Sequence, residues 1–395
     1  MHSGRGMNLI QSLRQEARQA PESGIVAVAN HGRGKPGLIP LWAGESDLAT
    51  PEFITRPTVA ALQAGETFYT WQRGIPELRQ ALADYHARHF GGSFRPEEFI
   101  VTGSGMQSIQ MALDAVAGHG DEVIHLSPAW PNFPAAVGIA GATSVAVPLE
   151  RTTQGGWVCD PAAVEAAVTP RTRALFINTP SNPTGWTADR ETLVAILEIA
   201  RRHGLWIIAD EIYALFCYGE TRAPSFLDIA DPDDRIIYVN TFSKNWAMTG
   251  WRMGWLKVHP SLQQVFENLV QYSTSGVPQF LQRGGVAALA EGDAFIASQV
   301  EQAGRCRDAL VGRLVATGRV RALPPQGAFY LFFEIDGVAD TKPAALRIVD
   351  EANVGLAPGT AFGPGGDGFF RACFHRRLDL VEEAGDRLAG WISAL

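Results

Sequence analysis

The sequence has few cysteines, and none of them is spaced to hold zinc or to carry out dithiol chemistry. Cys159, Cys217, Cys306 and Cys373 stand far apart, outside any Cys-x-x-Cys pair. The chain also lacks the ~18 consecutive apolar residues of a membrane span, and its N-terminal residues lack the apolar run of a secretory signal. We therefore expect reduced thiols, a cytoplasmic location and no contact with a membrane.

Positive charge is scarce as well. Lys and Arg number 33 against 41 Asp and Glu, a net charge of −8, so the composition shows no electrostatic footprint for nucleic acid. His86 and His89 form a His-x-x-His pair with no third ligand nearby in the sequence, and neither a His-Glu-x-x-His nor a Gly-x-Ser-x-Gly motif is present. These absences argue against a metal site and against a serine hydrolase.

What the chain does have is a length of 395 residues and a hydrophobic content of 46%, enough for a large core and for two or three domains. Short apolar runs alternate with amphipathic stretches up to about residue 290, which predicts an α/β fold with a largely parallel sheet. The strands expected there are 99–102, 122–126, 174–178, 205–209 and 236–240, and the helices include 105–117 and 191–203.

After residue 290 the alternation ends. The pattern predicts helices over 293–317, 344–352 and 378–395, and strands at 328–335 and 368–374. Such a mixture indicates a smaller α+β domain. We expect a large domain over 46–290 and a small domain made of 1–45 with 291–395, the N-terminal part packing against this second domain or against a neighbouring subunit.

The strongest local motif is the segment 240–255, Asn-Thr-Phe-Ser-Lys-Asn-Trp-Ala-Met-Thr-Gly-Trp-Arg-Met-Gly-Trp. It follows a predicted strand, so Ser243 and Lys244 are expected at the carboxyl edge of the sheet, where ligands bind in open α/β folds. Apolar neighbours lower the pKa of a lysine and make its amine nucleophilic, which suits Schiff-base chemistry. Arg252 can supply a bidentate clamp for phosphate.

Two further strand ends carry polar side chains. Asp210 ends a buried strand and can hold a cationic ring nitrogen, with Tyr213 close behind it, although a plain capping turn is the alternative. The loop 178–185, Asn-Thr-Pro-Ser-Asn-Pro-Thr-Gly, is stiffened by two prolines, which would hold Asn182 rigidly as a hydrogen-bond donor.

The segment 101–107, Val-Thr-Gly-Ser-Gly-Met-Gln, predicts a strand, a glycine turn and a helix start whose N–H groups can cup a phosphate. A dinucleotide-binding fingerprint would need a third glycine where Ser108 stands, although Asp121 falls near its acidic position, so a nicotinamide enzyme is disfavoured. Trp130 can stack on an aromatic ligand or simply pack in the core. Arg371, among phenylalanines, needs an anion from the protein or from a ligand.

Together these segments resemble the class I and II aminotransferases, which are fold type I pyridoxal-phosphate enzymes. The resemblance runs from about residue 41 to the C-terminus, with the motifs in the family's order: 68–79, 103–105, 182–185 (Asn-Pro-Thr-Gly), 210–213 (Asp-Glu-Ile-Tyr), 243–252 (Ser-Lys…Thr-Gly-Trp-Arg), 327–331 (Gly-Ala-Phe-Tyr-Leu) and Arg371. The resemblance implies an aminotransferase whose large domain has a mostly parallel seven-stranded sheet, beside a smaller α+β domain.

The resemblance also implies a role for each matching residue. Lys244 would form the Schiff base with pyridoxal 5'-phosphate and then shuttle the proton, and Asp210 would pair with the ring nitrogen. Asn182 and Tyr213 would hydrogen-bond the 3-oxygen of the ring, and Trp130 would stack on its face. The phosphate would be held by Ser104, Gly105, Met106, Ser243 and Arg252.

On the substrate side, the resemblance implies that Arg371 clamps the α-carboxylate, with Trp130 and Asn182 also in contact with the substrate. Gly44 matches the position where the N-terminal segment passes over the substrate. Tyr69 would reach the phosphate of a neighbouring subunit, which implies a homodimer with shared sites. The reaction would be a ping-pong transfer of an amino group between an L-amino acid and a 2-oxo acid.

The substrate stays open at this stage. The segment Trp71-Gln-Arg73 is expected at the substrate entrance, where the tryptophan would favour an apolar or aromatic side chain and the arginine a second carboxylate. Phe133 and Phe329 could also shape the pocket, and 2-oxoglutarate or pyruvate is the default acceptor. A C–S β-lyase or synthase on the same fold would use the same lysine and aspartate. An effector domain of a transcription regulator would need a DNA-binding domain, for which the residues before the match are too few.

Overall fold

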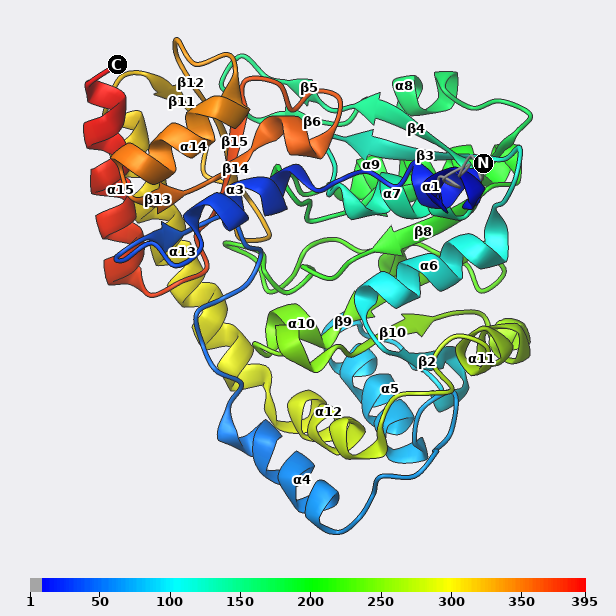
Figure 1. The fold of residues 1–395 in the computed structure, drawn as a ribbon. Coiled ribbons are helices and arrows are strands. Elements are labelled where there is room, and N and C mark those ends of the chain that lie inside the picture. The colour runs from blue at the N-terminus through cyan, green and yellow to red at the C-terminus, as the bar shows by residue number, and fades with distance from the viewer. Residues whose placement is uncertain (1–8) are drawn as a thin grey trace, which may run out of the picture.

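The computed structural model describes residues 9–395. Its main sheet has seven strands, namely β2 (Phe99–Thr102), β3 (Glu122–Ser127), β4 (Thr143–Pro148), β7 (Thr172–Asn178), β8 (Trp206–Asp210), β9 (Ile236–Thr241) and β10 (Gly254–Lys257). They lie in the order β2-β10-β9-β8-β7-β3-β4 (Figure 1). All neighbouring pairs are parallel except the two that involve β10.

The central strands are apolar on both faces because helices cover both sides of the sheet. Ile207 and Ile208 of β8 are both fully buried, yet they belong to different core clusters on opposite faces. One face is covered by α6 (Gly105–Val116), α7 (Asn132–Ile139) and α11 (Gln263–Gln271); the other by α8 (Pro161–Ala166), α9 (Arg190–His203), α5 (Pro76–Phe90) and α12 (Gln279–Glu291). The short helix α4 (Glu52–Gln63) packs on α12.

All five strands predicted for this part of the chain are present, with small shifts at their ends, as are the helices at 105–117 and 191–203. The sequence analysis did not predict β4 or β10. β4 is an edge strand whose residues are mostly half-exposed, so it lacks the apolar run that marks its neighbours. β10 has only four residues, and its first two, Gly254 and Trp255, end the segment 240–255, which was interpreted as a motif and not as a strand.

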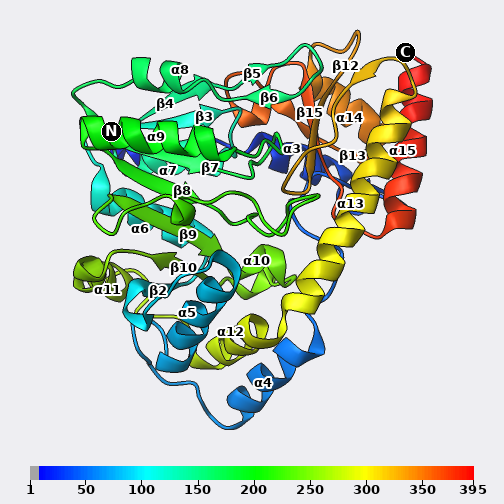
Figure 2. The same cartoon turned by 180° about the vertical axis from the view of Figure 1, so that it is seen from behind.

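A second sheet of four strands follows in the order β11-β12-β15-β14, from β11 (Val320–Arg321), β12 (Tyr330–Ile335), β14 (Ala357–Pro358) and β15 (Phe369–Cys373). It shares a core with α13 (Asp293–Val315), α14 (Thr341–Glu351) and α15 (Leu378–Ser393). Figure 2, seen from behind, shows α13 running from α12 to the side of α15 and so linking the two sheets. The elements expected after residue 290 are therefore present.

The N-terminal residues bridge the two parts of the molecule. The helix α3 (Gly24–Gly32) packs on α14, and β1 (Ile39–Pro40) pairs in parallel with β13 (Val354–Gly355), as expected for packing against the second sheet. Earlier, α1 (Leu9–Ser12) and α2 (Gln15–Arg18) lie near α7, where Arg14 Nη2 donates to the Ile139 carbonyl at 3.5 Å. The segment between these contacts therefore crosses from one sheet to the other.

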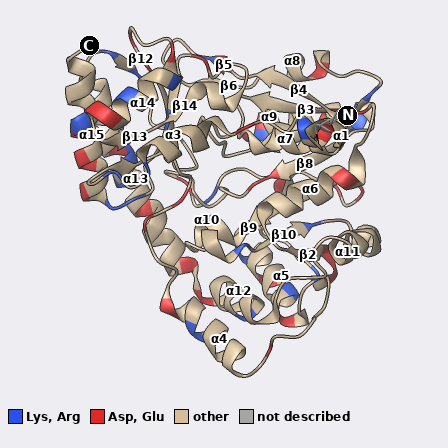
Figure 3. Ribbon diagram, in the orientation of Figure 1, with Lys and Arg blue, Asp and Glu red and all other residues tan. Residues whose placement is uncertain are grey.

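Three short elements, two strands and a helix, remain to be described. A two-stranded hairpin is made of β5 (Glu150–Arg151) and β6 (Trp157–Val158), and α10 (Phe242–Asn245) is the single turn that follows β9. In residues 9–395 no helix is both long and apolar enough to cross a membrane. The longest of them, α13, carries acidic and basic residues along its length (Figure 3).

Candidate active site

A cavity of about 280 Å³ lies at the carboxyl edge of the main sheet. Because parallel strands end at the same edge, their following loops meet there although they are far apart in the sequence. The residues that line the cavity come from the ends of β8 and β9, the start of α6, the loop before α7 and the segment after α10: Gly105, Met106, Ile109, Trp130, Asn132, Asp210, Ile212, Val239, Thr241, Ser243, Lys244 and Arg252. The predicted motifs around positions 105, 130, 210 and 244 thus share one space.

Lys244 lies in α10, directly after β9, and its amine reaches the cavity. Its Nζ donates a hydrogen bond to the Gly44 carbonyl at 2.8 Å and lies 5.9 Å from the centre of the Tyr213 ring. Burial lowers the pKa of Lys244 to about 8, with the charges of Arg371 and Arg252 acting in the same direction. A measurable fraction of the amine is therefore unprotonated and nucleophilic near neutral pH.

Asp210 ends β8 next to that amine and is almost fully buried. Its carboxylate accepts one long hydrogen bond, 3.5 Å from the Ile212 N–H. Burial raises the pKa of Asp210 to about 7, against the opposing effect of the Lys244 charge. A buried carboxylate with so little stabilisation favours a cation brought in by a ligand, because a positive partner restores the charged form.

Arg371 of β15 is buried, with an exposed fraction of 2%, and has no acidic partner among its hydrogen bonds in the described chain. Its Nη1 donates to Asn182 Oδ1 at 3.0 Å, its Nη2 donates to the Trp42 carbonyl, and its Nε is buried without a partner. The guanidinium lies over the rings of Tyr330, at 4.7 Å, and Phe362, at 5.0 Å. N–H groups are thus left for an anion, as the sequence predicts.

Asn182 is held at both its backbone and its side chain. Its backbone N–H donates to Asn178 Oδ1 at 2.9 Å, which ties the loop to β7 as its two prolines suggest. The side-chain oxygen accepts from Arg371, a contact that the sequence did not predict. The amide NH2 of Asn182 is left to face a ligand, while its oxygen orients the guanidinium.

The start of α6 lies at the cavity, where a cup for an anion is expected. Gly105 and Met106 stand in the first helical turn, where backbone N–H groups have no intrahelical acceptor. Ser104 Oγ instead accepts from the Gln107 N–H at 2.9 Å and caps the helix, so this hydroxyl has a structural task as well. Ser243 and Arg252 line the same cavity.

Tyr213 is buried behind the cavity, and its hydroxyl lies 2.7 Å from that of Tyr330 on β12. The sequence analysis quoted Tyr330 in the 327–331 motif but assigned it no role. Trp42, whose carbonyl receives Arg371, and Thr241 and Asn132, which line the cavity, were also missed. Nothing in their local patterns marks these residues, because each one acts through its backbone or through its place in the fold.

Several residues considered for the substrate pocket lie elsewhere. Phe133 is fully buried and stacks on Phe176, with ring centres 3.6 Å apart, and Phe329 is fully buried against Phe216. Neither lines the cavity. Arg73 pairs with Glu267 at 3.1 Å, so accepting a substrate carboxylate, one of the two alternatives left open by the sequence, would require it to exchange this partner.

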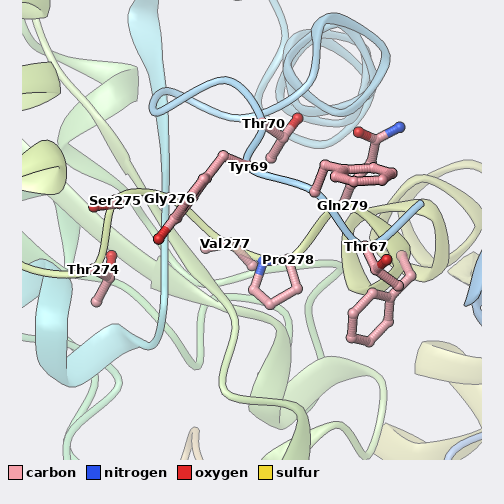
Figure 4. Close-up of a pocket in the computed structure, with 11 residues that line it drawn as sticks. Thr67, Tyr69, Thr70, Thr274, Ser275, Gly276, Val277, Pro278 and Gln279 are labelled. Carbon is pink, nitrogen blue, oxygen red and sulfur yellow. The ribbon is translucent and has the colours of Figure 1, made fainter. Parts of the chain in front are cut away.

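Tyr69 lies outside this cavity, with an exposed fraction of 93%. It lines a second hollow of about 390 Å³ between residues 67–70 and 274–280 (Figure 4). Its neighbour Trp71 is also exposed. Figure 4 shows Tyr69 and Thr70 coming from one segment, with Thr274 to Gln279 coming from the other.

The two histidines of the His-x-x-His pair contact other side chains. His86 accepts from Trp255 Nε1 at 3.1 Å, and burial lowers the pKa of His86 to about 3. His89 lies 3.1 Å from Asp293. Asp121, near the acidic position of a dinucleotide site, pairs with Arg173 at 2.8 Å.

Known proteins resemble this chain over almost its whole length. The family model described as aminotransferase class I and II matches residues 36–388. The aspartate/prephenate aminotransferase of Thermus thermophilus is 35% identical over 357 residues, covering 89% of this chain and 90% of that protein. The aspartate aminotransferase of Thermotoga maritima has a solved structure that superposes with a TM-score of 0.89 at 32% identity, over 96% of this chain and 99% of that one. An alanine aminotransferase from Pyrococcus furiosus superposes with a TM-score of 0.90 at 28% identity, over 97% and 100%.

Proposed function

Because the chain belongs to the class I and II aminotransferases, a family that depends on pyridoxal phosphate, and is itself an aminotransferase, we propose that it holds pyridoxal 5'-phosphate in the cavity beside Lys244. There it moves an amino group between an L-amino acid and a 2-oxo acid. One observation carries this proposal: a nucleophilic amine, a buried carboxylate without a cation and an anion cup line the same 280 Å³ space.

The residues present fit the cofactor at three separate points. The N–H groups of Gly105 and Met106 and the side chains of Ser104, Ser243 and Arg252 suit a phosphate dianion. The buried Asp210 suits a protonated ring nitrogen, and Trp130 lines the cavity where the ring face would lie. The amide of Asn182 and the hydroxyl of Tyr213 suit an oxygen anion on the ring.

When bound, the cofactor supplies an electron sink that stabilises negative charge at the substrate Cα. Lys244 supplies the amine that carries the cofactor between turnovers. Once released, its Nζ takes the proton from Cα and returns it elsewhere, a task for which a pKa of about 8 suits it at neutral pH. Asp210, ionised opposite a positive ring nitrogen, keeps that nitrogen protonated.

Arg371 orients the substrate. Its free N–H groups bind the α-carboxylate in two parallel hydrogen bonds, and the contact with Asn182 Oδ1 fixes the plane of the guanidinium. Holding the carboxylate in this way decides which bond at Cα faces the amine of Lys244. Gly44, whose carbonyl holds that amine, lies in the segment that closes over the substrate.

The working unit in this proposal is a homodimer. Phe68, Tyr69, Trp71 and Tyr272 are exposed aromatic side chains with exposed fractions of 84%, 93%, 59% and 87%, and Tyr69 reaches into the cup of a second copy. Exposed aromatics gathered in this way are typical of a subunit interface. Within each subunit we propose a large domain over 46–290 and a small domain made of 1–45 with 291–395.

The donor is the part of the proposal that the relatives inform most. Their names point to aspartate, prephenate-derived amino acids and alanine as the first compounds to test. Arg73 is engaged with Glu267, so this chain does not offer it for a second carboxylate. Whichever amino acid serves, its α-carboxylate meets Arg371.

The test is a half-reaction. Purified protein is loaded with pyridoxal 5'-phosphate and given single L-amino acids without an oxo acid, while its visible absorption is recorded. A donor should bleach the visible band and leave one equivalent of its 2-oxo acid, and Lys244→Ala should show neither change. Release of ammonia with pyruvate or sulfide instead would replace the proposal with a lyase. A protein that never takes up the cofactor would contradict the proposed site altogether.

A further inference from the structure

We propose that Tyr330 is a positioning residue that ties the substrate clamp to the phenol facing the cofactor, an inference that rests on the function proposed above. It lies on β12, behind the cavity rather than in its lining, and is fully buried. Three of its contacts reach three different groups of the site. No local feature of its sequence distinguishes it from an ordinary core aromatic residue.

The first contact is with Tyr213. The two hydroxyls lie 2.7 Å apart and the two rings are perpendicular, with centres 5.7 Å apart. Each phenol has one proton, so only one of the two can donate in this pair. If Tyr213 donates to an oxygen anion of the bound ring, its own oxygen is free to accept, and Tyr330 becomes the donor to it.

The second contact is with Arg371, whose guanidinium carbon lies 4.7 Å from the centre of the Tyr330 ring. A cation over a phenol ring withdraws electron density and makes its O–H a stronger donor. The arrangement therefore favours a chain that runs from Tyr330 through Tyr213 to the ring oxygen. Successive hydrogen bonds in a buried chain strengthen one another, so the hydroxyl of Tyr330 affects a group that it does not touch.

The third contact is with Gly44. A Cβ added at Gly44 would collide with the hydroxyl of Tyr330 and lie 3.2 Å from its Cζ, so the chain passes this ring at a distance that only glycine allows. The same segment places the Trp42 carbonyl on Arg371 and the Gly44 carbonyl on Lys244. The Tyr330 ring therefore fixes the position of this segment, whose two carbonyls orient the Arg371 guanidinium and the Lys244 amine.

Plain packing is the competing explanation, because Tyr330 also lies against Phe329, with ring centres 4.9 Å apart. The two explanations differ in the hydroxyl. A packing role needs the ring alone, which Tyr330→Phe keeps, whereas the proposed role needs the O–H. Tyr218→Phe is a matched control, because Tyr218 donates to the Ala328 carbonyl at the same 2.7 Å but lies outside the cavity.

The experiment is a pH titration of the visible absorption of the loaded enzyme, with melting temperature and half-reaction kinetics alongside. In Tyr330→Phe the midpoint of this titration should move upward by about half a pH unit to one unit. The oxygen of the cofactor ring then receives a weaker hydrogen bond and carries more negative charge, so the neighbouring proton on the Lys244 nitrogen is held more tightly. The half-reaction rate should fall by about 3- to 10-fold with little change in half-saturation. Tyr218→Phe should titrate as the wild type does.

A titration of Tyr330→Phe that coincides with those of the wild type and Tyr218→Phe would overturn the inference and leave only packing. A drop in melting temperature without a shift of the midpoint would have the same meaning. Failure of the proposed function looks different, since the wild type itself would then show no visible band to titrate. An upward shift confined to Tyr330→Phe supports the inference.

Discussion

Replacing Arg371 with leucine should remove most of the reactivity toward amino acids while leaving the cofactor in place. The reason lies in what the guanidinium touches. Its hydrogen bonds go to Asn182 and to the Trp42 carbonyl, and its Nε has no partner in the described chain, so N–H groups are left over for a substrate carboxylate. In the described chain, Arg371 makes no hydrogen bond to Asp210 or to the residues proposed to hold the phosphate.

The size of the effect follows from the number of free donors. Three of the five N–H groups of Arg371 remain, and a carboxylate can take two of them in charge-assisted hydrogen bonds, each worth about 1.5–3 kcal/mol. Their loss sums to about 3–6 kcal/mol, which lowers kcat/KM by about 10²- to 10⁴-fold. Leucine also leaves Asn182 Oδ1 and the Trp42 carbonyl without their donor, at a cost of about 1–3 kcal/mol of stability each.

The assay compares the half-reaction rate against amino acid concentration with the dissociation constant of the cofactor, measured by fluorescence. Arg73→Leu is the matched control. Its ion pair with Glu267 is partly exposed, so the change should cost at most about 1 kcal/mol and leave the substrate dependence intact. Loss of the cofactor from Arg371→Leu, or a kcat/KM within tenfold of the wild type, would refute the reasoning.

Three further changes test other parts of the site. Burial raises the pKa of Asp210 from 3.8 to about 7 in the folded chain, so the cofactor-free protein should lose stability as the pH rises between these two values. Asp210→Asn should remove this part of the loss, which melting curves recorded against pH will measure. Gly44→Ala should cost about 1–3 kcal/mol and slow the half-reaction, because the added methyl collides with Tyr330. Tyr69→Phe should leave the monomer fold unchanged but weaken cofactor retention in the dimer, and equal retention would contradict the shared site.

Much of the fold follows from local pattern. Apolar runs bounded by turn residues mark buried strands such as 236–240 because burial on both faces leaves no polar positions. The edge strand β4 escapes this rule because most of its residues are half-exposed, and β10 escapes it because its first two residues belong to the 240–255 motif. The edge strand β2 is buried throughout and was predicted, whereas the half-exposed edge strand β4 was not, so the pattern reports burial and not the position of a strand in the sheet.

The candidate site was predictable where a residue's chemistry is tied to its place in a motif. Lys244, Asp210 and the 103–106 turn each follow a strand, and parallel strands deliver their ends to one edge. Arg73 and Phe133 show the limit. Both were plausible pocket residues by type, yet one is paired with Glu267 and the other stacks on Phe176, partners from distant positions that no local pattern reveals.

The order and chemistry of the motifs come from the sequence alone: an amine, a carboxylate and a phosphate cup at strand ends or a helix start, and an arginine within a strand that needs an anion. Only the tertiary structure brings Trp42, Gly44, Tyr213 and Tyr330 around Arg371 and Lys244, because these contacts join the first residues of the chain to its last strand. Local pattern reports how a residue relates to its neighbours in the chain, whereas burial, pKa and orientation depend on neighbours supplied by the fold.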